Sequence, residues 1–130
     1  MQKSQTPAYF EYLNSLDNGV TAFGHISQNN GPVFIIEIEG FLDNENSKDF
    51  MNSVLNVLRE QEREYTKVIL DLGKLTYLSS TGVGTFNNIM LQMQNLNKKF
   101  YLMNVGEKTK SVLKLLGLYS FFEIYEGSEI

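Results

Sequence analysis

The chain has 130 residues, no cysteine and a formal net charge of −4. This length fits one domain with a single core, and a content of 42% hydrophobic and 20% charged residues is ordinary for a globular protein. The negative charge disfavours nucleic acid as the partner, because phosphate binding normally needs a basic patch. No apolar leader and no run of about 20 apolar residues is present. We therefore expect a cytoplasmic protein that does not enter a membrane.

The first predicted element is a short helix over residues 7–16. Thr6 and Pro7 suit its N-cap and its first helical position. Phe10 and Leu13 belong to a broad apolar face of this helix. The helix precedes the main pattern of the chain, so we predict an N-terminal extension over residues 1–19.

A β-hairpin is predicted next, with strands over residues 20–27 and 33–39. The turn between them, QNNGP, contains Asn and Gly residues that tolerate positive φ angles. In the second strand, Val33 and Ile35 fall on the face opposite Phe34 because side chains alternate along a strand. We expect the N-terminal helix to cover part of the face that carries Val33 and Ile35.

Helix and strand patterns alternate after the hairpin. Apolar spacing predicts helices over about 47–62, 80–97 and 108–116, and strands over 67–72, 100–104 and 121–125. Gly117 suits the position that follows a helix C-terminus. Alternation with short links predicts an α/β fold with a mainly parallel sheet and right-handed crossovers.

Three hydroxyl side chains, Ser79, Ser80 and Thr81, lie where a predicted strand passes into a predicted helix. Ligands and partners usually bind at the carboxyl ends of strands in such sheets, and a helix N-terminus there presents unpaired N–H groups. In a purely structural alternative, Ser79 or Ser80 caps the helix, and Gly82 and Gly84 allow the helix to pack close to the sheet. From the residues alone, a binding site and a purely structural role both remain open.

Catalysis by a serine nucleophile has little support. A nucleophile elbow needs glycine two residues before the serine, where Leu78 stands, and His25 is the only histidine. The segment Gly82-Val83-Gly84 lacks the third glycine of a dinucleotide fingerprint, and no phosphate-loop lysine follows. We therefore expect neither an enzyme nor a nucleotide cofactor.

A metal site is also disfavoured. Asp43, Glu45 and Asp49 are close in sequence, but they have no histidine beside them and no loop with ligand spacing. Acidic residues in a solvated loop and a helix cap explain them better. We expect no metal.

The segment DLGKLTYLSSTGVGTF, residues 71–86, resembles the signature of STAS domains, the anti-sigma factor antagonists. The matching residues are Asp71, Leu72, Tyr77, Leu78, Ser79, Ser80, Thr81, Gly82 and Val83. Residues 40–43, GFLD, and residues 112–125 resemble two further family segments, so the resemblance covers about residues 20–126. It implies a STAS domain over residues 20–130. Ser79 is a departure, because classical antagonists often carry Asp there, although serine occurs in the broader family.

The resemblance implies a switch protein with no catalytic role. Such domains bind an anti-sigma factor that is also a serine kinase of the histidine-kinase ATPase type, and a PP2C-type phosphatase reverses the phosphorylation that ends the binding. Matched by position, the phosphorylated residue is Ser80, with Ser79 expected to cap the helix. The implied partner-binding residues are Asp43, Asn44, Ser79, Thr81, Gly82 and Val83.

The same family implies one alternative. STAS domains also serve as scaffolds and as accessory subunits of transport or signalling assemblies, in which the serine need not be phosphorylated. A neighbouring gene for a serine kinase or a PP2C phosphatase would favour the switch. A neighbouring lipid transporter would favour the scaffold.

Overall fold

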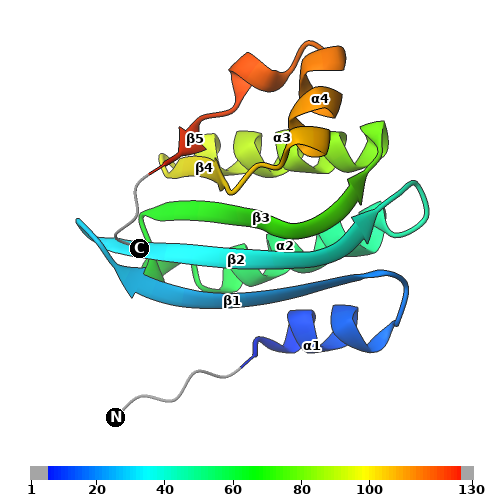
Figure 1. Cartoon of the computed structure of the whole chain (residues 1–130). Helices are drawn as coiled ribbons and strands as arrows, with labels where there is room; N and C mark the ends of the chain where they lie inside the picture. The colour runs from blue at the N-terminus through cyan, green and yellow to red at the C-terminus, as the bar shows by residue number, and fades with distance from the viewer. Residues whose placement is uncertain (1–5, 127–130) are drawn as a thin grey trace.

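The computed structural model describes residues 6–126, which form a five-stranded sheet with helices packed against one of its faces (Figure 1). The helices are α1 (Ala8–Ser15), α2 (Ser47–Glu60), α3 (Ser80–Asn95) and α4 (Glu107–Leu115), and the strands are β1 (Val20–Gln28), β2 (Pro32–Leu42), β3 (Lys67–Leu78), β4 (Lys99–Met103) and β5 (Ile124–Tyr125). Short 3-10 turns lie at Glu62–Glu64 and Tyr119–Phe121. None of the described helices is both long enough and apolar enough to cross a membrane.

The strand order is β1-β2-β3-β4-β5. β1 pairs antiparallel with β2, and the other neighbours pair parallel, which confirms the predicted hairpin and mainly parallel sheet. The hairpin turn contains Asn30 and Gly31, both with positive φ. Because β2, β3 and β4 are parallel, their carboxyl ends lie at one edge of the sheet.

The main core lies between the sheet and the helices. Phe34, Ile36 and Ile38 alternate along β2, point to the same face and are at most 1% exposed. On that face the rings of Phe50 from α2 and Phe86 from α3 meet edge to face, with centroids 6.3 Å apart. Removal of these apolar side chains from water is the main favourable contribution to folding.

Helix α1 packs on this same face, beside α2. Its Phe10 and Leu13 side chains are fully buried in the main core. The prediction that the helix covers the opposite face, at Val33 and Ile35, is therefore wrong. Gly24 of β1 leaves room for this packing, since a Cβ atom there would be 2.6 Å from the Phe34 ring and 3.2 Å from the Phe10 ring.

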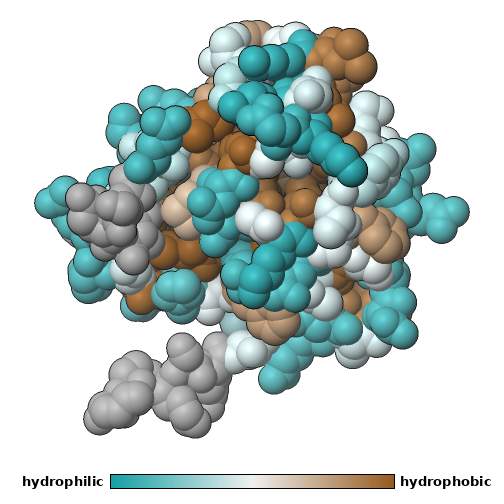
Figure 2. Space-filling view, viewed as in Figure 1, coloured by the Kyte–Doolittle hydropathy of each residue, from teal (hydrophilic) through white to brown (hydrophobic). Residues whose placement is uncertain are grey.

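The opposite face of the sheet has its own apolar cover. Val33, Ile35 and Ile69 are at most 5% exposed there and contact Tyr101 and Tyr125, among others. The two tyrosine rings meet at 72° with centroids 5.6 Å apart. Figure 2 shows this helix-free face, where hydrophobic residues lie among hydrophilic ones. Side chains of the sheet itself therefore cover the apolar residues that the N-terminal helix was expected to cover.

Three strand boundaries differ clearly from prediction. β2 continues to Leu42 rather than ending at Glu39. β3 continues to Leu78 rather than ending at Leu72, and β5 contains only Ile124–Tyr125, because residues 119–121 form a 3-10 turn. The long β3 stays paired with β2 through register shifts near Glu37/Glu39 and Gly40/Phe41. The prediction that Thr6 caps α1 is also wrong, since Pro7 is the N-cap and no side-chain cap bond forms.

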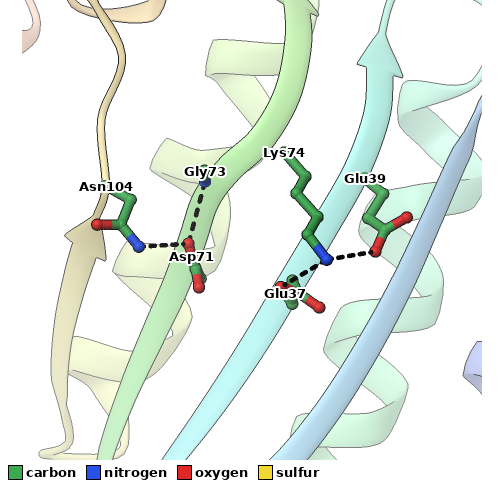
Figure 3. A network of polar contacts seen from close by, with 6 residues as sticks. All are labelled: Glu37, Glu39, Asp71, Gly73, Lys74 and Asn104. Carbon is green, nitrogen blue, oxygen red and sulfur yellow. Dashed lines mark hydrogen bonds and ion pairs between the residues drawn. The ribbon is translucent and has the colours of Figure 1, made fainter.

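Polar side chains on the helix-free face support the irregular part of β3 (Figure 3). Asp71 Oδ1 accepts hydrogen bonds from Gly73 N and Asn104 Nδ2, each at 3.0 Å. Lys74 Nζ lies 3.4 Å from Glu39 and 3.5 Å from Glu37. Its hydrogen bond to Glu39 and the charges of Glu37 and Glu39 raise the pKa of Lys74.

Candidate functional site

Ser79 joins the end of β3 to the beginning of α3. Its Oγ accepts a hydrogen bond from Gly82 N at 3.1 Å, and its backbone N–H donates to Leu42 O at 2.9 Å. The first bond satisfies an N–H group that has no partner within the helix. This geometry confirms the expectation that Ser79 caps the helix, and it ties the helix start to the end of β2.

Ser80 and Thr81 are both exposed in the first turn of α3. The Ser80 hydroxyl therefore lies near backbone N–H groups at the positive end of the helix dipole. A phosphate group at this position would be stabilised by those donors. Exposure makes either hydroxyl accessible to a second protein, whereas the Ser79 hydroxyl is already engaged as the cap.

Gly82 and Val83 lie beneath the surface rather than on it. Val83 is fully buried, and Gly82 is buried against Leu78 and Leu42. Of the residues assigned to partner binding from the sequence, these two present no side chain to a partner. They set the position of the exposed first turn instead.

The loop between β2 and α2 is held by two interlocking side chains. Asp43 Oδ1 accepts hydrogen bonds from Glu45 N at 2.9 Å and from Asn46 N at 3.0 Å. Asn46 is 1% exposed, and its Oδ1 accepts from Asp43 N while its Nδ2 donates to Phe41 O, both at 2.9 Å. Asn44 is exposed at the tip of this loop.

Sequence reasoning did not identify Asn46. Its spacing from Asp43, in a D-x-x-N pattern just before a predicted helix, was the available signal for a self-bonded loop. The two side chains fix the loop conformation, so the exposed Asn44 is presented from a rigid base.

One groove joins these elements. It is lined by the β2–α2 loop, the junction of β3 and α3, and the far end of α4: Asp43, Asn44, Glu45, Tyr77, Leu78, Ser79, Ser80, Val112, Leu115 and Leu116. We call this the Ser80 groove. The structure thus brings Asp43 and Asn44 together with Ser79 and Ser80, as the resemblance implied, although the groove lining does not include Thr81.

The apolar part of the Ser80 groove was not foreseen from the sequence. Leu115 is 87% exposed, Tyr77 is 57% exposed and Leu116 is 41% exposed. Large apolar side chains gathered at this level of exposure are typical of protein-binding surfaces. The Leu115-Leu116 pair at the end of a predicted helix was the signal that could have found them.

The charged side chains that line the Ser80 groove, Asp43 and Glu45, are both acidic. Neither sits in a metal cluster, since the described residues contain no group of three or more His, Cys, Asp or Glu side chains able to hold an ion. His25 is exposed in the middle of β1, opposite Ile35. At ~3.3 Å per residue, Ile35 lies roughly 20 Å along β2 from Leu42, so His25 is not a neighbour of the hydroxyls.

Comparison with known proteins identifies the family. The family model described as the STAS domain matches residues 26–129, and the chain belongs to this family. A Staphylococcus epidermidis protein named anti-sigma-B factor antagonist is 27% identical over 63 residues, which are 48% of this chain and 58% of that protein. The match therefore spans little more than half of this relative's length.

Solved structures show the same fold. The anti-sigma factor antagonist SpoIIAA of Bacillus, in its unphosphorylated form, has a TM-score of 0.63 with 17% identity, covering 82% of this chain and 89% of the other. A sulfate transporter family protein from Wolinella succinogenes has a TM-score of 0.57 with 19% identity, covering 68% and 70% of the two chains. At these identities the likeness establishes the fold alone.

Proposed function

We propose that this protein is an antagonist-type switch without catalytic activity of its own. In the unphosphorylated state it binds an anti-sigma factor that is also a serine kinase, and phosphorylation of Ser80 ends that binding. The observation that carries this proposal is the Ser80 groove, in which an exposed serine at a helix N-terminus adjoins exposed apolar residues. Membership of the STAS family and the name of the staphylococcal relative support it.

Geometry favours Ser80 over its neighbours as the phosphorylated residue. The Ser79 hydroxyl accepts the capping hydrogen bond from Gly82 N. Phosphorylation of this hydroxyl by a kinase would therefore remove the helix cap. Thr81 is exposed but is not part of the groove lining. Ser80 alone among the three hydroxyls is both exposed and within the groove.

Electrostatics explains why a phosphate would act on the partner rather than on the fold. The helix N–H groups would stabilise a phosphate at Ser80, so the domain would stay folded. The phosphate would add about 1.5 to 2 negative charges to a groove that already contains Asp43 and Glu45. A partner that docks there would meet repulsion and a desolvation cost, and a hundredfold loss of affinity needs only about 2.7 kcal/mol.

The proposal is tested with the cognate serine kinase and ATP, followed by peptide mass spectrometry. Wild type and the single variants Ser79→Ala, Ser80→Ala and Thr81→Ala are compared. We expect Ser80→Ala alone to lose the phosphate while it still binds the kinase. A PP2C-type phosphatase should restore binding to the phosphorylated wild type.

Two results would count against the switch. Full phosphorylation of the Ser80→Ala protein would exclude Ser80 as the modified residue. Unchanged partner binding by fully phosphorylated wild type would exclude the mechanism and would favour the scaffold role.

A further inference from the structure

Two Asn-Gly pairs occur in the sequence, Asn18-Gly19 and Asn30-Gly31. Asparagine is a thermolabile residue. The backbone nitrogen of the next residue can attack its side-chain carbon Cγ, and a following glycine shields that nitrogen least because glycine has no side chain. Whether either pair reacts in the folded protein therefore depends on how the fold holds these atoms.

The Asn30-Gly31 pair is open to this reaction. Both residues are exposed at the tip of the turn between β1 and β2. Within residues 6–126, the Asn30 side chain forms no hydrogen bond, and the Gly31 N–H has no backbone acceptor. The attacking nitrogen and the amide that it attacks therefore have no competing partner, and water reaches both.

The Asn18-Gly19 pair, in the link between α1 and β1, is held by its surroundings. Asn18 is half-buried, its Nδ2 donates to Asp49 Oδ2 at 3.5 Å, and its Oδ1 is buried. The backbone carbonyl of Asn18 accepts from Asn46 Nδ2 at 3.1 Å, and that of Gly19 accepts from Phe41 N at 2.9 Å. Reaction at Asn18 would require the link to leave these contacts.

Asn29 provides a second contrast within the same turn. Its Nδ2 donates to the Tyr125 hydroxyl at 3.1 Å, so its side chain is engaged. The residue that follows it is Asn30, whose side chain shields the backbone nitrogen that would have to attack. Asn30 alone among these three asparagines combines a following glycine with a free side chain.

We propose that Asn30 is a site of spontaneous deamidation in the folded protein, with water as the co-reactant. Gly31 N attacks Asn30 Cγ, and the new N–Cγ bond closes a succinimide ring. The Cγ–Nδ2 bond breaks, and the proton of the Gly31 amide leaves with the side-chain nitrogen as ammonia. Water then opens the ring at one of its two carbonyl carbons, which gives aspartate or isoaspartate without oxidation or reduction.

The two products act differently on the hairpin turn. Each adds a negative charge at residue 30. Isoaspartate also routes the backbone through the side chain and so adds one atom to the main chain, within a turn in which Asn29 N donates to Gly31 O at 2.9 Å. We therefore expect isoaspartate to disturb this bond. The Ser80 groove is unaffected, since the turn adjoins Pro32 at the beginning of β2 and the groove follows Leu42 at its end.

Peptide mass spectrometry of wild type, after incubation at mildly alkaline pH, tests the proposal, and fragmentation spectra locate each converted residue. In the folded protein we expect Asn30 to react at least tenfold faster than Asn18 or Asn29. In urea the two Asn-Gly pairs should react at similar rates, because only the fold distinguishes them. An Asn30 that stays unmodified in the folded protein, or an Asn18 that reacts there as fast as Asn30, would overturn the proposal.

The effect of isoaspartate on the turn is measured against Asn30→Asp. This variant is the matched control, because it carries the new charge without the additional main-chain atom. The isoaspartate form, purified by chromatography, should melt at a lower temperature than Asn30→Asp. Equal melting temperatures would overturn the claim that the longer backbone disturbs the turn.

Discussion

Gly82 lies so close to Leu78 that a Cβ atom on the glycine would be 2.6 Å from Leu78 Cδ1. The same Cβ atom would be 3.0 Å from Leu42 Cβ. These contacts link the ends of β2 and β3 to the first turn of α3, which carries Ser80. The glycine is therefore needed for close approach, and the placement of the Ser80 hydroxyl depends on it.

We predict that Gly82→Ala lowers the free energy of unfolding by about 1 to 3 kcal/mol, since the added methyl group overpacks this junction. Gly84→Ala is the matched control. A Cβ atom at Gly84 meets nothing within 4 Å, so alanine there should stabilise the helix by roughly 0.5 to 1 kcal/mol. Urea denaturation of both variants gives the comparison. Equal stability changes in the two variants would contradict the close-approach argument.

Tyr65 gives a prediction about pH. It is 1% exposed, its hydroxyl donates to Leu58 O at 2.7 Å, and burial, with a smaller contribution from the charge of Glu62, raises its pKa. The unfolded chain therefore loses this proton first, near pH 10. Stability from the neutral tyrosine is complete below that pH and is lost as the pH rises above it.

We predict that wild type loses stability more steeply than Tyr65→Phe between about pH 10 and pH 12. At neutral pH the variant should be less stable by about 1 to 3 kcal/mol, because the Leu58 carbonyl loses its buried donor. Tyr12→Phe, at a 57% exposed position, should keep the wild-type slope. Parallel pH profiles for wild type and Tyr65→Phe would show that Tyr65 does not titrate differently on folding.

The docking of α1 can be tested with one core residue and one surface residue of the same helix. Leu13 is fully buried, whereas Tyr12 is 57% exposed. We predict that Leu13→Ala costs about 2 to 5 kcal/mol of stability and that Tyr12→Ala costs less than about 1 kcal/mol. Thermal denaturation measures both. If deletion of residues 1–18 left the melting temperature unchanged, the helix would contribute nothing to the core.

Local patterns in the sequence predicted most of the fold. The apolar periods of α2 and α3, the Asn30-Gly31 turn and the alternation of elements led to the hairpin and the parallel sheet, because these features depend on neighbouring residues. The side of the sheet on which α1 packs depends instead on distant contacts. Phe10 fits beside Gly24, and Tyr125 covers the other face, and neither fact follows from the spacing of residues in α1.

The same limit applies to β3 and to the Ser80 groove. Glycine is typical of turns and lysine is polar, yet Gly73 and Lys74 both lie within β3. Register shifts between β2 and β3 accommodate them, and Lys74 forms ion pairs with Glu37 and Glu39. The hydroxyls were found from the sequence because they adjoin one another. Leu115 was missed, since its exposure follows from how α4 turns Leu113 into the core.

Leu115 provides the sharpest test of the apolar part of the Ser80 groove. This residue is 87% exposed, so Leu115→Ala should leave the stability of the free protein unchanged within about 0.5 kcal/mol. If the proposed kinase partner buries it, unphosphorylated Leu115→Ala should bind about tenfold more weakly, a loss of about 1.4 kcal/mol.

Isothermal titration calorimetry with the kinase measures this loss. Leu91→Ala, at a 48% exposed position on α3 outside the groove lining, should bind like wild type. Equal affinity of Leu115→Ala and Leu91→Ala would show that the partner does not reach α4. If Ser80→Asp still abolished binding in that case, the switch would remain in place and the contact would be confined to the β2–α2 loop and the first turn of α3.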